Sequence, residues 1–164
     1  MKEMKRILSL TLFIIFLLCG CSVQSADDYY NSADNDGSLS ATISINCQTA
    51  VDYPDCDVEN AEVLNDFTVH FNDGDTVYDV LVKACKLNKI QFEYEGSGSS
   101  TYIKGINYLY EFDCGELSGW EYSVNGVFPS VGCGSYKLSD GDNIKWLYTC
   151  DLGADIGNKY KGGE

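Results

Sequence analysis

The sequence predicts an α+β fold in which a small, disulfide-stabilised sheet packs against one helix. Three observations lead to this prediction. Short segments in which apolar and polar residues alternate recur along the chain, as is typical of half-buried strands. A single stretch, residues 76–88, carries apolar residues at helical spacing behind a capping sequence. Beyond Cys19 and Cys21 the chain has six cysteines, an even number that favours disulfides in an exported protein.

The first 20 residues are predicted to be a signal peptide, with an apolar run over residues 7–18 behind basic residues at positions 2, 5 and 6. This run is too short to span a membrane comfortably. It leads into Leu18-Cys19-Gly20-Cys21, which resembles the lipobox of bacterial lipoproteins. We therefore expect Cys21 to carry lipid, palmitate included, and to anchor the mature chain to the cell membrane on its extracytoplasmic side. The alternatives are an uncleaved anchor and a secreted protein in which Cys21 forms a disulfide.

The charge of the chain argues against nucleic acid as a partner. The whole chain has 25 acidic and 11 basic residues, and without residues 1–20 it would have 24 and 8, a formal charge of −16. Such a field repels phosphate backbones and anionic lipid surfaces alike. We expect the protein to meet the membrane through its lipid anchor, and we interpret the acidity mainly as a source of solubility.

Residues 21–40 are predicted to be a flexible tether, because they are too poor in apolar side chains to offset the entropy of ordering them. The stretch Asp34-Asn35-Asp36-Gly37 is similar to part of a calcium-binding loop. With Gly37 at the invariant glycine, however, Ser32 takes the first ligand position and Ile43 takes that of the bidentate glutamate. We interpret the stretch as solvated linker.

The folded domain is expected over residues 41–153, with a polar tail at 154–164. Residues 41–47 and 67–71 alternate as two half-buried strands, and His70 falls on the polar side of the second. A helix should begin after Thr76, because Thr76-x-x-Asp79 has the form of a capping box, and Asn88 is a plausible end signal. Its apolar stripe consists of Val77, Val80, Leu81, Ala84 and Cys85.

Several strands are expected after the helix. Residues 90–95 alternate again and close in a glycine- and serine-rich hairpin loop, and residues 102–112 form a further extended stretch. Residues 120–128 predict a hairpin that turns at Asn125-Gly126, a type I′ signal. The last strand should present one apolar side, made of Ile144, Trp146 and Tyr148. This order predicts a β-grasp-like sheet that cradles one helix.

Three disulfides are predicted among the six cysteines of the domain, in one of 15 connectivities. The expected pairs are Cys47–Cys150, Cys114–Cys133 and Cys56–Cys85. The first follows if the opening and closing strands are parallel neighbours, as in a β-grasp sheet. The second would link the loops that flank the Trp120 hairpin, and the third pairs what remains. A zinc site is the rival interpretation, but no two of these cysteines are spaced as C-x-x-C and the chain has one histidine.

Four motifs together resemble a known family. They are GDTVYDVL at 74–81, YIKGI at 102–106, SGWEYSVNG at 118–126 and YKLSDGDNI at 136–144. They are similar to the transcobalamin-like C-terminal domain, also known as a bacterial domain of unknown function, over roughly Phe67 to Leu152. In the animal vitamin B12 carriers of this family, the domain closes over one face of a corrin ring and a helical barrel covers the other. The resemblance implies a contact region from Trp120 through Phe128, although this chain has no barrel to supply the second wall.

The resemblance and the aromatic hairpin define one candidate ligand site. Its residues are Trp120, Tyr122, Asn125 and Phe128. The ligand would be cobalamin, another corrinoid, or a different flat and partly apolar molecule. The alternative is that the aromatic residues are simply core. Alternation favours this alternative for Trp120, whereas Phe128, beside the turn, should be exposed.

Two functions stay open at this point: a non-catalytic surface lipoprotein that binds a small ligand, and a module that binds another surface protein or a glycan. An acidic surface would select basic partners in a salt-dependent manner. No catalytic residue is predicted, because no nucleophile with a paired base is recognisable and the acidic residues lie mainly in turns and on polar faces. No metal and no resident cofactor are expected.

Overall fold

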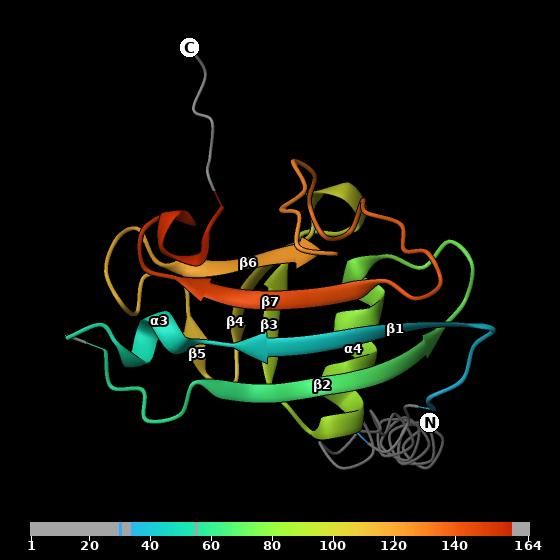
Figure 1. Ribbon diagram of the computed structural model, residues 1–164, viewed down its shortest axis with the longest axis horizontal. Helices are drawn as coiled ribbons and strands as arrows, with labels where there is room; N and C mark the ends of the chain where they lie inside the picture. The colour runs from blue at the N-terminus through green and yellow to red at the C-terminus, as the bar shows by residue number, and fades with distance from the viewer. Residues whose placement is uncertain (1–29, 31–33, 55, 159–164) are drawn as a thin grey trace, which may run out of the picture.

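The computed structural model describes residues 30, 34–54 and 56–158 and has an α+β fold (Figure 1). A four-stranded sheet has the order β2-β1-β7-β6, and a three-stranded sheet has the order β3-β4-β5. The strands are β1 (Leu39–Asn46), β2 (Glu62–Phe71), β3 (Phe92–Glu95), β4 (Tyr102–Ile106), β5 (Leu109–Tyr110), β6 (Gly119–Val124) and β7 (Asn143–Thr149). The helices are α3 (Gln48–Val51) and α4 (Val77–Asn88), and short 3₁₀ turns, η1 and η2, lie at Gly98–Ser100 and Ala154–Ile156.

The first and last strands of the larger sheet are parallel neighbours. Ile43 of β1 lies opposite Ile144 of β7, and Ile45 lies opposite Trp146. The β1–β2 and β6–β7 pairs are antiparallel. The structure confirms the α+β class, while the β-grasp-like assignment of the sheet stays a prediction.

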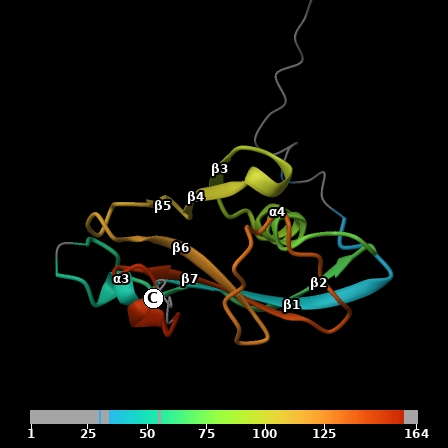
Figure 2. The same ribbon diagram turned by 90° about the horizontal axis from the view of Figure 1, so that it is seen from above.

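One face of the four-stranded sheet is covered by α4 and by the three-stranded sheet together (Figure 2). Alternating residues of β1, β6 and β7 point to this covered face, as the period of two requires. The core between the layers includes Ile43, Ile45, Val69, Phe71, Leu81, Ile106, Ile144, Trp146 and Tyr148, all of them buried. Helix α4 covers the β1–β2 side, and β4 lies against β6.

Helix α4 begins and ends as the sequence predicts. The Thr76 backbone N–H donates to Asp79 Oδ2 at 2.9 Å, and the Asp79 N–H donates to Thr76 Oγ1 at 3.3 Å, which completes the capping box. At the other end Lys89 adopts a left-handed conformation, and the Ile90 N–H donates to the Cys85 carbonyl at 2.9 Å. The apolar stripe of the helix is buried against the sheet.

The disulfide pairing differs from the prediction. The structure links Cys56 to Cys114, so the predicted pairs Cys114–Cys133 and Cys56–Cys85 are wrong. Both bonded cysteines lie in loops that the sequence pattern does not bring together. Cys47 and Cys150 are free thiols, so their predicted bond is not formed, although β1 and β7 are parallel as that prediction required. Cys85 and Cys133 are free as well, and both are buried.

The folded part extends beyond residues 41–153 at both ends. Asn35 lies along β2: its side-chain amide donates to the Thr68 carbonyl at 3.1 Å and its oxygen accepts from the His70 N–H at 2.8 Å. Asp36 forms a 3.1 Å ion pair with Lys83 of α4, and this pairing lowers the pKa of Asp36. The end of the predicted tether is therefore docked on the domain, and Leu39 already begins β1.

The first residues of the predicted polar tail, 154–164, are also folded against the domain. The Asp155 side chain accepts hydrogen bonds from the Thr149 hydroxyl and from the Cys150 N–H, so η2 is fixed to the end of β7. The predicted signal peptide and Cys21 lie outside the described residues. Among the residues that the structure does describe, no helix is long and apolar enough to cross a membrane.

The predicted Trp120 hairpin has its turn but not its second strand. Asn125 and Gly126 both have positive φ, as a type I′ turn requires, and Val124 bridges to Val127. After that bridge the chain leaves the free edge of β6, and Pro129 has no N–H to donate to a strand ladder. Residues 127–134 instead form a loop beside β6, here named the 127–134 loop.

Candidate ligand-binding site

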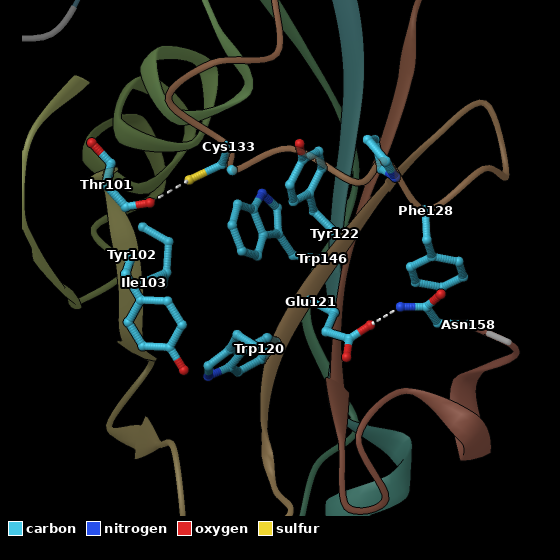
Figure 3. A pocket seen from close by; sticks show the side chains of 12 residues that line it. Thr101, Tyr102, Ile103, Trp120, Glu121, Tyr122, Phe128, Cys133, Trp146 and Asn158 are labelled. Atoms are coloured by element: carbon cyan, nitrogen blue, oxygen red, sulfur yellow. Dashed lines mark hydrogen bonds between the residues drawn. The ribbon is translucent and has the colours of Figure 1, made fainter. Parts of the chain in front are cut away.

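A cavity of about 210 Å³ lies between β4, the strands β6 and β7, and the 127–134 loop (Figure 3). Its lining is rich in aromatic residues from segments far apart in the sequence. The lining residues are Thr101, Tyr102, Ile103, Trp120, Glu121, Tyr122, Phe128, Pro129, Gly132, Cys133, Trp146 and Asn158. Three of the four predicted site residues, Trp120, Tyr122 and Phe128, therefore lie together at one hollow.

Trp120 serves both the core and the cavity wall. Its side chain is buried, with 6% of its surface exposed, and its indole N–H donates to the Leu109 carbonyl at 2.8 Å. Its ring meets Tyr148 edge to face at a centroid distance of 5.2 Å. The hydrogen bond and the ring contact hold the indole in place, so Trp120 gives the cavity one rigid wall.

Tyr122 joins β6 to the 127–134 loop. Its hydroxyl donates to the Val131 carbonyl at 2.6 Å, and burial raises the pKa of this hydroxyl. Its ring lies 5.5 Å from that of Trp146, centroid to centroid. The hydrogen bond places the loop over the sheet, so Tyr122 positions the opposite wall of the cavity.

Phe128 and Pro129 belong to that loop and line the cavity from its outer side. Phe128 is half-buried, rather than exposed as the sequence suggested. Its neighbours Val127 and Val131 are 66% and 47% exposed. The loop therefore presents exposed apolar side chains close in sequence to the cavity residue Phe128.

Asn125, the fourth predicted site residue, does not line the cavity. Its side-chain amide donates to Asp142 Oδ1 at 2.8 Å, and its oxygen accepts from the Asn143 N–H at 2.9 Å. The Asp142 carboxylate in turn accepts from the Ser139 N–H at 2.8 Å. Asn125 thus links its own turn to the turn that precedes β7, and its role in this arrangement is structural.

Residues of β4, β7 and the C-terminal segment also line the cavity, and the sequence pattern did not mark them as site residues. Thr101, Tyr102 and Ile103 enter from the smaller sheet, and Trp146 forms part of the cavity from β7. The side-chain amide of Asn158 donates to Glu121 Oε2 at 2.6 Å. Only the packing of the two sheets brings these segments together, so no local sequence signal marks them.

The charge inside the cavity is sparse and negative. Glu121 is the only charged residue among those that line it, and no Lys, Arg or His is among them. At the rim the Tyr102 hydroxyl donates to Glu111 Oε2 at 2.7 Å, and burial together with this carboxylate raises the pKa of Tyr102. The arrangement suits a neutral or cationic group and disfavours an anion.

Cys133 places a thiol in the cavity wall. The thiol donates to the Thr101 carbonyl at 3.8 Å, and burial raises the pKa of Cys133 to about 11. A thiol with this pKa is protonated at neutral pH and is therefore a poor nucleophile. His70, the one histidine of the chain, lies exposed on β2 and does not line the cavity.

Two other hollows are larger but have a different character. One, of about 630 Å³, lies beside the Cys56 disulfide and is lined in part by Asp57, Glu59 and Asp113. The other, of about 470 Å³, lies on the open face of the larger sheet beside Leu147. Within the described residues, no group of three or more His, Cys, Asp or Glu side chains is placed to hold a metal ion. We therefore regard the aromatic cavity as the candidate site.

Comparison with known proteins agrees with this fold. A family model described as a domain of unknown function, DUF4430, matches residues 74–149. The structure is similar to that of haptocorrin in complex with Cbi, with 22% identity and a TM-score of 0.51 over 74% of this chain. The matched part of the chain is therefore similar in fold to a transcobalamin-like domain. This domain and its flanks span 28% of the haptocorrin chain, so they correspond to only part of that protein.

A second solved structure is a proposed metal binding protein from Ruminococcus gnavus ATCC 29149. It has 13% identity and a TM-score of 0.46, and the match covers 68% of this chain and 96% of that one. No curated protein matches the chain. The comparisons thus show a match to the DUF4430 family model over residues 74–149 and a fold similar to that of part of haptocorrin.

Proposed function

We propose that the transcobalamin-like domain is a non-catalytic module that binds a small molecule at the aromatic cavity. The observation that carries this proposal is the position of the cavity: Trp120, Tyr122 and Phe128 line it, and the family resemblance implies ligand contact over the same stretch. Fixed aromatic walls with few polar groups are typical of sites for flat, partly apolar ligands. We also propose that the sheet that supports the cavity is β-grasp-like.

A corrinoid is the ligand that we favour, since haptocorrin is a structural relative that was solved with Cbi. A cavity of about 210 Å³ is smaller than the roughly 300–1,000 Å³ of sites that enclose a whole drug-sized ligand. It can therefore take one group of a corrinoid while the rest lies on the apolar mouth formed by Val127, Phe128 and Val131. Because much of the ligand stays exposed, we expect weak binding, on the order of micromolar or weaker.

Titration of cobalamin, followed by its visible absorbance, tests this function. Phe128→Ala should weaken binding about tenfold, because it removes apolar contact at the mouth of the cavity. Phe67→Ala is the matched control, since Phe67 is also half-buried but lies on β2, the edge strand farthest from the cavity. The absence of a spectral shift up to millimolar cobalamin and other corrinoids, or equal effects of the two variants, would overturn the proposed site.

We further propose that lipidated Cys21 anchors the protein to the extracytoplasmic side of the cell membrane. The support is the lipobox-like sequence together with the polar segment between Cys21 and the docked Asn35. A multiply acylated cysteine anchors firmly, whereas a single acyl chain binds only marginally. Cys21→Ser should release the protein or leave it unprocessed. Membrane retention of a processed Cys21→Ser protein would contradict the anchor.

A specific observation favours a second candidate function, the binding of a surface protein. Phe112, Leu117 and Leu152 are 62%, 45% and 62% exposed, and backbone hydrogen bonds Phe112 N–H to Ser118 O and Leu152 N–H to Leu117 O hold their loops together. Each of the three residues has an exposed acidic neighbour in the sequence. A partner with a basic and apolar surface would fit. A photo-crosslinker at position 112 should then capture one partner in cells, whereas a crosslinker at position 67 should capture none.

A further inference from the structure

The two tryptophans of the domain differ in one respect that packing alone does not explain. Both are buried, at 6% and 2% exposure for Trp120 and Trp146. The Trp120 indole N–H donates to the Leu109 carbonyl, but the Trp146 Nε1 has no hydrogen-bond partner. Among the described residues it is the only buried side-chain nitrogen or oxygen in this state. Leaving a buried donor unpaired is unfavourable, and a phenylalanine would fill the core without that cost.

Three other polar side chains of the cavity already have partners within the protein. The Tyr122 hydroxyl donates to Val131, the Asn158 amide donates to Glu121, and the Cys133 thiol donates to Thr101. Figure 3 shows the Trp146 ring in the midst of these lining residues, with its nitrogen on the edge nearer Cys133. The protein thus supplies no acceptor for Trp146, and a ligand in the cavity is placed to supply one.

Charge and size restrict the group that can carry this acceptor. An anionic acceptor would meet Glu121 and no compensating cation. The volume of about 210 Å³ equals roughly seven times the ~30 Å³ that a water molecule occupies in the liquid. A compact neutral group fits both limits. A carboxamide also has an N–H that can donate to the Glu121 carboxylate or to the backbone carbonyls of the wall.

We propose that the cavity receives a neutral carboxamide group whose carbonyl oxygen accepts a hydrogen bond from Trp146 Nε1. This proposal rests on the ligand-binding function proposed above. Less than 1 Å² of this nitrogen is reachable by solvent, so a neighbouring side chain shifts when the ligand enters. The 3.8 Å hydrogen bond of Cys133 is long and weak, which makes this side chain easy to displace. Trp146 is thereby a specificity-determining residue for the ligand.

Proton–nitrogen NMR of the purified full-length chain tests this assignment, because its two tryptophans give two indole N–H signals. Trp146→Phe removes one signal and so assigns both. Propionamide should move the Trp146 signal downfield, with a dissociation constant on the order of millimolar, and leave the Trp120 signal in place as an internal control. Propionate, of nearly the same shape but charged, should leave both signals unmoved.

The variant and an apolar probe separate this proposal from the ligand-binding function itself. Trp146→Phe should weaken propionamide about tenfold and leave benzene nearly unchanged, since only the amide uses the indole donor. If benzene shifts signals of cavity residues while propionamide leaves the Trp146 signal unmoved in the unsubstituted chain, the amide proposal is wrong and the cavity stands. If benzene, propionamide and corrinoids all leave the spectrum unchanged, both proposals fall. The unsubstituted chain decides these outcomes even if Trp146→Phe does not fold.

Discussion

Around α4 the sheet is covered by fully buried aliphatic side chains such as Val80 and Leu81, whereas around β6 the same face carries aromatic rings beside a cavity. We name these regions the α4 half (β1, β2 and α4) and the β6 half (β4, β6, β7 and the 127–134 loop). In the α4 half the helix is capped at both ends and its apolar stripe is buried. In the β6 half an indole donor has no partner and a thiol makes only a long hydrogen bond. The difference supports our proposal that the α4 half supplies stability and the β6 half binds a ligand.

The largest expected effect concerns the disulfide, which links the loop before β2 to the loop before β6 and so holds the two halves together. Its cysteines are 58 residues apart, a separation for which loop-closure entropy predicts about 4 kcal/mol of stabilisation. Cys56→Ser/Cys114→Ser should lower the free energy of unfolding in urea by this order. Cys150→Ser, at a free thiol, is the control and should cost much less. Mass mapping that finds Cys56 bonded to any cysteine other than Cys114 would refute the pairing.

A cavity in the α4 half should harm stability and spare binding. Leu81 is 0% exposed, and Leu81→Ala should lower the free energy of unfolding by about 3 kcal/mol, through lost apolar contact and the void left behind. The affinity for corrinoid of the remaining folded protein should not change. Equilibrium denaturation and the absorbance titration measure the two quantities separately. An equal loss in both would show that the halves are not independent.

A smaller effect is expected at alkaline pH. Burial raises the pKa of Cys85 to about 12 and that of Cys133 to about 11, from an ordinary 9.0. Below pH 9 both thiols are protonated in the folded and the unfolded chain and contribute nothing. Above pH 9 the unfolded chain loses these protons first, so stability falls as the pH rises. Cys85→Ala and Cys133→Ala should each reduce this fall, as urea midpoints between pH 8 and 10.5 can show. A fall that is unchanged in both variants would contradict the burial of these thiols.

Local patterns predicted the elements of the fold better than they predicted its long-range contacts. The capping box at Thr76 and the turn at Asn125-Gly126 are set by neighbouring residues, and both are found. The Cys56–Cys114 pair depends on how two loops meet, and the sequence holds no periodic signal for that. The hairpin prediction failed at its return strand: β7, distant in sequence, pairs with one edge of β6, and the chain leaves the other edge after Val127.

The candidate site was predictable to a similar degree. Trp120 and Tyr122 could be identified because they alternate on one strand and belong to a family motif. Periodicity could not decide whether these two residues belong to the core or contact a ligand, because both kinds of residue face the same side of β6. Trp146 was predicted to face inward, but its missing hydrogen-bond partner becomes visible only when every neighbour is placed.

Hydrogen exchange of the full-length chain with and without saturating cobalamin tests most directly whether binding belongs to the β6 half. We predict slower exchange for amides of β6 and the 127–134 loop, because the ligand covers the cavity and fixes the loop. Amides of α4 should exchange at unchanged rates as long as they open locally rather than by global unfolding. Protection confined to α4, to β2 or to the open face of the larger sheet would contradict the assignment of the site.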